Sequence, residues 1–253
     1  MLNRPFFGQF AVSTALVLTL ALPATAQALK EYSDAERAQF RAEVRAYLLD
    51  NPEVIREAIE VLQNREAETA LQADVTLVTD NAADIFDDGY SFVGGNPDGD
   101  IVLVEFMDYR CPYCKRAHNE VTKLLATDGN IKLIVKELPI LGEQSVLASR
   151  FAVATKQLAG GDSYKAMNDA LMAFNGDVTL PALRRLATTF ELDADAIEAH
   201  MNSDEVSAEI TATRALASKL AISGTPTFVL QDEMLRGYLP YDQMQALIAE
   251  KRN

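Results

Sequence analysis

Two cysteines separated by two residues are the most reactive feature of this sequence. The stretch Cys111-Pro112-Tyr113-Cys114 follows a short apolar run from Ile101 to Phe106 and precedes a run with apolar residues at helical spacing, Lys115 to Ala126. The first run predicts a strand buried on both faces, and the second predicts a helix. We therefore expect Cys111 at a helix N-terminus, where unpaired backbone N–H groups and the macrodipole stabilise a thiolate.

This position predicts redox chemistry for the pair. The thiolate is the nucleophilic form of cysteine, so a lowered pKa makes Cys111 reactive near neutral pH. Cys114 follows one helical turn later, close enough to form a disulfide with Cys111. Pro112 fits the first turn of a helix, because its missing N–H would have no partner there. The pair is predicted to carry two electrons by thiol–disulfide exchange through a mixed disulfide.

A zinc site and an inert structural disulfide are the alternatives for these cysteines. The chain has only two cysteines and two histidines, whereas a structural zinc site usually takes four such ligands. Nothing supplies a second half, so no metal site is predicted. A disulfide between residues three apart closes too short a loop to stabilise the fold much. His118 is interpreted as an ordinary surface or capping histidine, and no role is assigned to His200.

The residues around the cysteines resemble a known family. Glu105 in the strand, the Cys-Pro-Tyr-Cys turn and the distant Gly224-Thr225-Pro226-Thr227-Phe228 are similar to the DsbA-like thiol–disulfide oxidoreductases of the thioredoxin superfamily. The resemblance runs from about Gly95 to Asn253. It implies that Cys111 is the attacking cysteine and Cys114 the resolving one.

The resemblance also implies supporting roles for the neighbours of the redox pair. Pro226 matches the family's cis-proline, which lies against the disulfide and offers backbone groups to the substrate chain, and Thr225 before it tunes the redox pair. Glu105 matches a buried acid that moves the proton of the resolving cysteine. Pro112 and Tyr113 lie between the cysteines. Tyr113 cannot be cationic, unlike the histidine of the strongest family oxidants.

The charges next to the pair bear on its redox potential. Lys115 and Arg116 follow Cys114 directly and are expected to replace the missing histidine in part. Positive groups near the first cysteine stabilise the reduced form and make a protein more oxidising. We therefore expect a potential less oxidising than the family extreme.

The predicted fold is α/β: a thioredoxin fold with an inserted helical domain, preceded by an N-terminal α-helical extension. The thioredoxin domain is expected over residues 91–253, with the helical insertion at about 143–221. A second strand is expected over residues 131–135, a hairpin over 227–230 and 234–239, and a last helix from Tyr241. Within the insertion the spacing predicts helices near 143–159, 163–174, 179–189 and 193–220.

Residues 1–28 have the pattern of a cleavable signal peptide. Arg4 gives a positive start, residues 10–22 form an apolar core, and small residues follow that allow cleavage after Ala28 or Ala26. The apolar core is shorter than the roughly 20 residues of a membrane span. The mature protein is therefore expected to be soluble and periplasmic, in an oxidising compartment where disulfide chemistry is useful.

Residues 29–90 are predicted to form a separate helical unit. Ser33 and Glu36 make a capping box, and Asn51-Pro52-Glu53 has the pattern of a second helix start. The segment resembles the N-terminal extension of ScsC-like members of the family, which are multimeric disulfide-shuffling proteins. The resemblance implies homo-oligomerisation through this segment. The alternatives are that these helices pack back on the catalytic domain or form a mobile spacer.

The acidic composition excludes one class of partner. The formal net charge is −14, whereas nucleic-acid binding requires Lys and Arg patches. The chain has no phosphate-binding glycine loop, so no cofactor is predicted and the cysteines themselves carry the redox equivalents.

These features predict a secreted enzyme, a protein disulfide oxidoreductase that forms or shuffles disulfides in exported proteins, with disulfide isomerase favoured. Its partners are exported proteins with thiols or disulfides and a membrane or soluble redox partner that resets the cysteines. The alternatives are a monomeric dithiol oxidase of the DsbA type and a holdase or copper-binding protein with secondary redox activity.

Overall fold

The computed structural model describes residues 33–252, which divide into two compact units, one up to Ile59 and one from Glu60 onward. The predicted signal peptide lies outside the described residues. Among the helices of residues 33–252, none combines the length and the apolar character that crossing a membrane requires.

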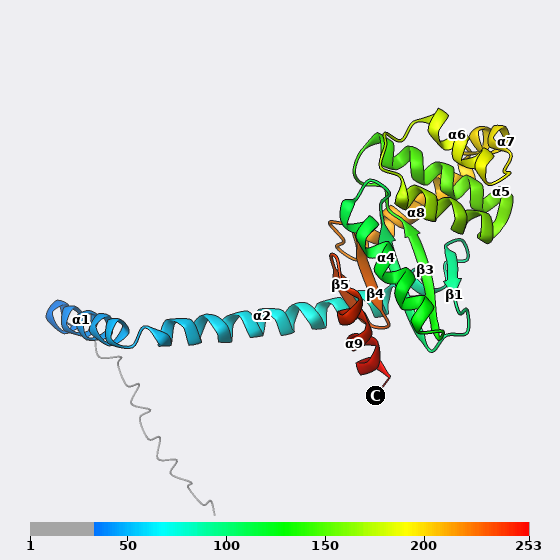
Figure 1. Cartoon of the computed structure of the whole chain (residues 1–253). Coiled ribbons are helices and arrows are strands. Elements are labelled where there is room, and N and C mark those ends of the chain that lie inside the picture. The colour runs from blue at the N-terminus through cyan, green and yellow to red at the C-terminus, as the bar shows by residue number, and fades with distance from the viewer. Residues whose placement is uncertain (1–32, 253) are drawn as a thin grey trace, which may run out of the picture. The chain divides into compact units, whose positions relative to one another are not determined.

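A five-stranded mixed sheet lies at the centre of the second unit (Figure 1). The strands are β1 (Phe92–Gly95), β2 (Ile101–Met107), β3 (Ile131–Glu137), β4 (Thr227–Leu230) and β5 (Glu233–Arg236), in the order β1-β3-β2-β4-β5. Strands β2 and β3 are parallel and are joined by α4 (Pro112–Thr127), while the other pairs are antiparallel. The predicted βαβ unit around the cysteines is therefore confirmed.

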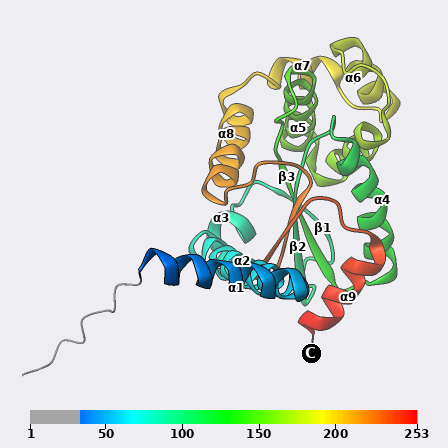
Figure 2. The same cartoon turned by 90° about the vertical axis from the view of Figure 1, so that its left-hand side faces the viewer.

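Helices cover both faces of this sheet, which explains why β2 and β3 have apolar residues in succession. Figure 2 shows α4 and α9 (Tyr241–Lys251) on one side and α3 (Ala82–Phe86) and α8 (Asp204–Lys219) on the other. Every residue of β2 and β3 except the second one in each strand is buried. A strand with two covered faces loses the alternation of apolar and polar residues, so the continuous apolar run predicted this environment correctly.

The predicted helical insertion is present between β3 and β4. It contains α5 (Glu143–Ala173), α6 (Leu180–Thr189), α7 (Ala194–His200) and α8. Helix α5 is kinked at Gly160, whose φ of 83° is not helical. The single helix predicted over residues 193–220 is wrong, because the chain breaks after α7 and Ser203 caps α8 by accepting a hydrogen bond from the Val206 N–H.

Strand β1 is absent from the sequence-based prediction, whose first strand begins at Ile101. Phe92 to Gly95 pair antiparallel with β3, from Phe92 opposite Val135 to Gly95 opposite Lys132. Two of the four residues are glycines, which normally weaken a strand. Strand β5 also differs from the prediction, since it begins at Glu233 and ends at Arg236.

Within the described residues 33–252, three helices precede the sheet: α1 (Asp34–Asp50), α2 (Glu53–Asp80) and α3. The predicted capping box is present, because the Ser33 and Glu36 side chains each accept a hydrogen bond from the other's backbone N–H. A break at Asn81 separates α2 from α3, and the Asn81 side chain donates to the Leu77 carbonyl. Val78 and Ile85 lie in the same buried cluster as residues of the sheet and of α8.

Candidate active site

The two cysteines lie where β2 ends and α4 begins. Cys111 is the N-cap of α4, and its sulfur accepts a hydrogen bond from the Cys114 backbone N–H at 3.4 Å. Pro112 occupies the first helical turn, where a missing N–H costs nothing. The sulfur of Cys111 therefore faces the positive end of the helix dipole, as the sequence predicts. Both cysteines are free in this structure.

The pKa values of the two thiols are shifted in opposite directions. A side-chain hydrogen bond from Cys114 is the largest cause that lowers the pKa of Cys111, to about 6 from an ordinary 9.0, and the Thr225 side chain and the backbone N–H groups of Cys114 and Tyr113 lower it further. Cys114 is fully buried. Burial, followed by its bond to Cys111, raises the pKa of Cys114 well above the ordinary value. One thiol is thus a nucleophile at neutral pH and the other holds its proton.

The segment before β4 lies against the reactive sulfur. The Cys111 thiol donates to the Thr225 backbone carbonyl at 3.1 Å, across 114 residues of sequence. The bond between Thr225 and Pro226 is cis, as the resemblance implies. Pro226 is buried, and its carbonyl accepts from the Gly237 N–H at 2.9 Å. The turn before β4 and the start of α4 together form the reactive site.

Glu105 lies inside the molecule in the middle of β2. It is 3% exposed, and its Oε1 atom has no hydrogen-bond partner among the described residues. Burial is the largest cause that raises the pKa of Glu105 to about 8, and the charges of Glu137 and Cys111 raise it further. Glu105 also raises the pKa of Cys114 by its charge. A carboxyl that exchanges a proton near neutral pH is therefore close to the resolving cysteine.

A second buried carboxyl, Glu137, was not identified from the sequence. Its two oxygens accept hydrogen bonds from the hydroxyls of Tyr109 at 2.6 Å, Tyr164 at 2.7 Å and Ser149 at 2.7 Å. Burial raises the pKa of Glu137 to about 7, although these three hydrogen bonds oppose that rise. The sequence shows only Lys136-Glu137 at the end of a strand, a pattern that usually indicates exposed charges.

Asp108 is a further residue that the sequence did not identify. It is fully buried, and its Oδ1 accepts from the Arg110 N–H at 2.7 Å. Its Oδ2 accepts from the backbone N–H groups of Ile140 and Leu141 at 2.8 and 3.0 Å. The Asp108 N–H donates to the sulfur of Cys114 at 3.5 Å. Asp108 therefore joins the loop before Cys111 to the loop after β3.

Tyr113, between the cysteines, is 56% exposed. The neighbouring cations are engaged elsewhere: Lys115 donates to the Phe174 carbonyl, and the Arg116 guanidinium lies 4.7 Å from the centre of the Tyr238 ring. Neither cation is among the leading causes of the low pKa of Cys111. Hydrogen bonds, rather than the expected cations, therefore stabilise the Cys111 thiolate.

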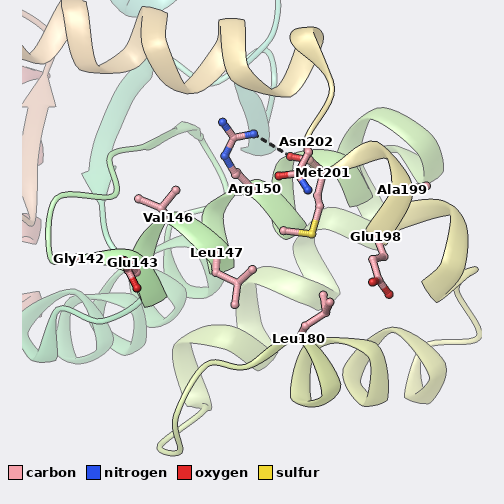
Figure 3. Close-up of a pocket in the computed structure, with 10 residues that line it drawn as sticks. All are labelled: Gly142, Glu143, Val146, Leu147, Arg150, Leu180, Glu198, Ala199, Met201 and Asn202. Atoms are coloured by element: carbon pink, nitrogen blue, oxygen red, sulfur yellow. Dashed lines mark hydrogen bonds between the residues drawn. The ribbon is translucent and has the colours of Figure 1, made fainter.

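A groove in the helical insertion is separate from the cysteines (Figure 3). Its volume is about 850 Å³, and its lining contains neither cysteine nor any of the predicted supporting residues. Figure 3 shows the apolar side chains of Leu147, Leu180 and Met201 around it, with Arg150 donating to the Met201 carbonyl at 3.0 Å. The reactive site is thus defined by the chemistry of its side chains and not by the size of a hollow.

Comparison with known families finds two family models that match separate parts of the chain. The family model of the DSBA-like thioredoxin domain matches residues 102–249, and that of the copper resistance protein ScsC N-terminal domain matches residues 36–68. The latter range covers most of α1 and the first half of α2.

Two solved structures illustrate the similarity. A thioredoxin-like oxidoreductase from Silicibacter pomeroyi DSS-3 is 40% identical with a TM-score of 0.64, over 68% of this chain and 98% of that one. Proteus mirabilis ScsC in a transitional conformation is 28% identical with a TM-score of 0.64, over 87% of this chain and 98% of that one. The second similarity extends over both compact units.

Curated relatives match a part of the chain that makes up about 62% of its length. Disulfide bond formation protein D of Bacillus subtilis (strain 168) is 24% identical, over 62% of this chain and 75% of the relative. Na(+)/H(+) antiporter NhaA 3 of Salinispora tropica is 29% identical, over 62% of this chain and 24% of the relative. The chain thus spans about a quarter of the length of the first curated relatives it matches.

Proposed function

Since the chain belongs to the DSBA-like thioredoxin domain family, whose model covers residues 102–249, we propose that it is a thiol–disulfide oxidoreductase acting on protein substrates. The observation that carries this proposal is that the pKa values of the two thiols are shifted in opposite directions. Cys111 ionises with a pKa of about 6 at the start of α4, while burial keeps Cys114 protonated. Such a pair has one cysteine for attack and release and one for resolution.

The proposed exchange balances in atoms and electrons. A substrate thiolate attacks the Cys111 sulfur of the oxidised protein, the bond between Cys111 and Cys114 breaks, and Cys114 leaves as a thiolate that takes a proton. A second substrate thiolate then attacks the substrate sulfur of the mixed disulfide and releases Cys111 as a thiolate. The substrate dithiol loses two electrons and the cysteine pair gains them. The reverse sequence reduces a substrate disulfide.

The Thr225 carbonyl and Glu105 support these steps. The carbonyl lies 3.1 Å from the Cys111 sulfur, so the backbone beside Pro226 borders the place where a substrate chain reaches that sulfur. We assign Glu105 to proton exchange with Cys114, because its pKa of about 8 lets it give or take a proton near neutral pH. Pro112 and Tyr113 form the first helical residues between the cysteines.

A double variant tests the redox proposal. Wild-type protein should oxidise a reduced substrate or reactivate a scrambled one in a mild redox buffer, and Cys111→Ala/Cys114→Ala should do neither. A double variant that retained the full activity of the wild type in these assays would contradict the enzyme proposal and favour the holdase alternative. Circular dichroism of the double variant controls for its fold.

Disulfide isomerisation is the direction that we favour, with the monomeric dithiol oxidase as the alternative. An isomerase must present a thiolate and hold non-native chains, and several active sites around one cleft suit that task. Apolar side chains that a second copy can cover are exposed on α1 and α2, including Phe40, Tyr47, Ile55, Ile59 and Leu62. We propose that this segment, matched by the ScsC N-terminal model, forms a homo-oligomer.

Copper(I) binding is a second candidate, favoured by the name of the family matched at residues 36–68, a copper resistance protein domain. Two thiolates suit a soft ion such as copper(I). Titration of the reduced protein with copper(I) against a competing chelator tests it, and weak binding would exclude it.

The proposed location of the protein is the periplasm, with a membrane or soluble partner that resets the cysteines.

A further inference from the structure

Glu105 can serve Cys114 repeatedly only if its own proton exchanges with solvent. The carboxyl is 3% exposed and its Oε1 has no partner among the described residues. The charged or titratable groups around it are Glu137 on β3, both cysteines at the start of α4, and His118 and Lys165, which line a cavity together with it. A proton released by Glu105 therefore needs a route through the protein.

A small cavity begins at Glu105. Its volume is about 20 Å³, enough for one water molecule, which needs roughly 10–15 Å³. A buried water also needs two to four polar partners. The polar residues that line this inner cavity are Glu105, His118, Thr122, Lys165 and Asn168.

A second, larger hollow lies on the other side of His118. Its volume is about 520 Å³, and it is lined by residues of α4 and α5 and by Asn175. His118, Thr122 and Met172 line both the inner cavity and this outer hollow, so they form the wall between them. Of these three side chains, only the imidazole can take up and release a proton near neutral pH.

His118 has the contacts that this position requires. Its Nε2 lies 2.9 Å from the Asp169 Oδ1, and the side chains are 18% and 43% exposed respectively. Burial lowers the pKa of His118, while Asp169 opposes that effect and the positive charge of Lys165 adds to it. Lys115 and Arg116 also line the outer hollow. His118 thus borders the cavity that Glu105 also lines, and its Nε2 pairs with a carboxylate that lines the outer hollow.

We propose that His118, paired with Asp169, passes protons between solvent and Glu105 through the inner cavity. The role rests on the proposed thiol–disulfide exchange. When Cys114 leaves as a thiolate, the Glu105 carboxyl gives its proton to that sulfur and becomes a carboxylate. A solvent proton then reaches Glu105 by way of His118. In the reverse reaction Cys114 loses its proton to Glu105, and His118 returns it to solvent. No electrons move in these proton steps.

The test measures how fast a small dithiol reduces the oxidised protein, by acid quench and mass spectrometry across pH 5–9. His118→Leu is expected to slow the step about tenfold at pH 7, less than the loss of a group that acts directly on the reacting atoms. Added imidazole should restore the rate of His118→Ala. His200→Leu is the matched control, because His200 lines neither space, and it should match wild type.

A double variant separates a proton route from a merely structural role. If His118 acts through Glu105, His118→Leu should have no further effect on the rate in a Glu105→Gln background. Equal rates and pH profiles for wild type and His118→Leu would overturn the inference, as would an undiminished effect in the Glu105→Gln background without imidazole rescue. A wild-type protein that exchanges no disulfides would instead contradict the proposed function itself.

Discussion

At the scale of residues, the site depends on a difference between two thiols one helical turn apart. Cys111 is the N-cap of α4 and accepts hydrogen bonds, which favour the thiolate, whereas Cys114 is fully buried and its pKa is raised by that burial. Desolvation disfavours a charged thiolate, and hydrogen bonds to sulfur favour it. The same short sequence therefore produces both a good leaving group and a proton-bearing partner.

This difference predicts how Cys111 responds when its neighbour changes. In Cys114→Ala the largest cause of the low pKa is lost, so the pKa of Cys111 should rise and alkylation at pH 6 should become about three- to fivefold slower. Cys114→Ser keeps a hydrogen-bond donor and should lie between that variant and wild type. Alkylation rates measured against pH give both values. A midpoint near pH 6 that persisted in Cys114→Ala would show that the helix N-terminus and the remaining hydrogen bonds set the pKa of Cys111 without the Cys114 thiol.

Because Glu105 is buried, it should make the folded protein less stable as the pH rises, whereas a salt-bridged acid makes a protein more stable as the pH rises. Below about pH 4.5 the carboxyl is protonated in the folded and the unfolded chain. Between about 4.5 and 8 the unfolded chain releases the proton and the folded chain keeps it, so stability falls as pH rises through this window. Glu105→Gln should remove up to about 4 kcal/mol of the fall between pH 5 and pH 8. Urea unfolding of oxidised protein at both pH values measures it, and an unchanged slope would contradict the assigned burial.

The sequence predicted the residues of the site whose chemistry depends on local spacing. The positions of Cys111 and Pro112 followed from the junction of a strand and a helix, and Glu105 stood out because it interrupts an apolar run. Glu137 did not stand out, because its partners Tyr109, Tyr164 and Ser149 come from three distant places in the chain. No local pattern can show that a charge at the end of a strand is buried.

At the scale of elements, the sequence likewise predicts the end of a helix or strand only where the residues that determine it are close together in the chain. Capping at Ser33 was visible, since the residues that form it are three apart. Strand β1 was not, because it depends on pairing with β3 and contains Gly94 and Gly95. The start of α1 thus follows from local chemistry, while a short edge strand depends on its neighbour in the sheet.

The kink in α5 gives a prediction at this scale. Gly160 has a φ of 83°, and a Cβ there would meet no atom within 4 Å. Gly160→Ala should therefore destabilise the protein by about 1–3 kcal/mol through backbone strain alone, because with a ψ of −178° this backbone conformation is one that essentially only glycine adopts. Gly161→Ala is the matched control, because its Cβ would make an ordinary contact 3.5 Å from the Phe92 ring. Thermal unfolding compares the two, and equal stabilities would mean that the kink relaxes at no cost.

At the scale of the whole molecule, the core of the second unit includes residues that precede the sheet. Val78 and Ile85 are 2% and 0% exposed and lie in one cluster with Val104 and Phe106 of β2. Lys136, also fully buried, has its amine 2.5 Å from the Asp88 carboxylate. The catalytic fold therefore requires the chain from at least Val78 onward, and any test of the N-terminal helices must keep it.

A truncation that begins at Ala70 should separate oligomerisation from catalysis. It removes the segment matched at residues 36–68 but keeps Val78, Ile85 and Asp88, so it should stay folded and oxidise a reduced substrate at the wild-type rate. Reactivation of a scrambled substrate should be lost if several active sites must work together. Sedimentation should show one chain for the truncation and several for the protein from Leu29.

A truncation that begins at Tyr90 would not make this distinction. It removes two buried apolar side chains, worth about 1.5–3 kcal/mol each, and leaves the buried charge of Lys136 without Asp88, at a cost of about 3–5 kcal/mol. Their sum approaches the whole stability of a domain, about 5–15 kcal/mol. We therefore expect this shorter chain to unfold and lose both activities. A folded chain from Tyr90 would contradict this expectation. If, in addition, the chain from Ala70 still shuffled disulfides as a monomer, the N-terminal helices would have no part in the reaction, and the thioredoxin-like domain alone would carry the isomerase activity.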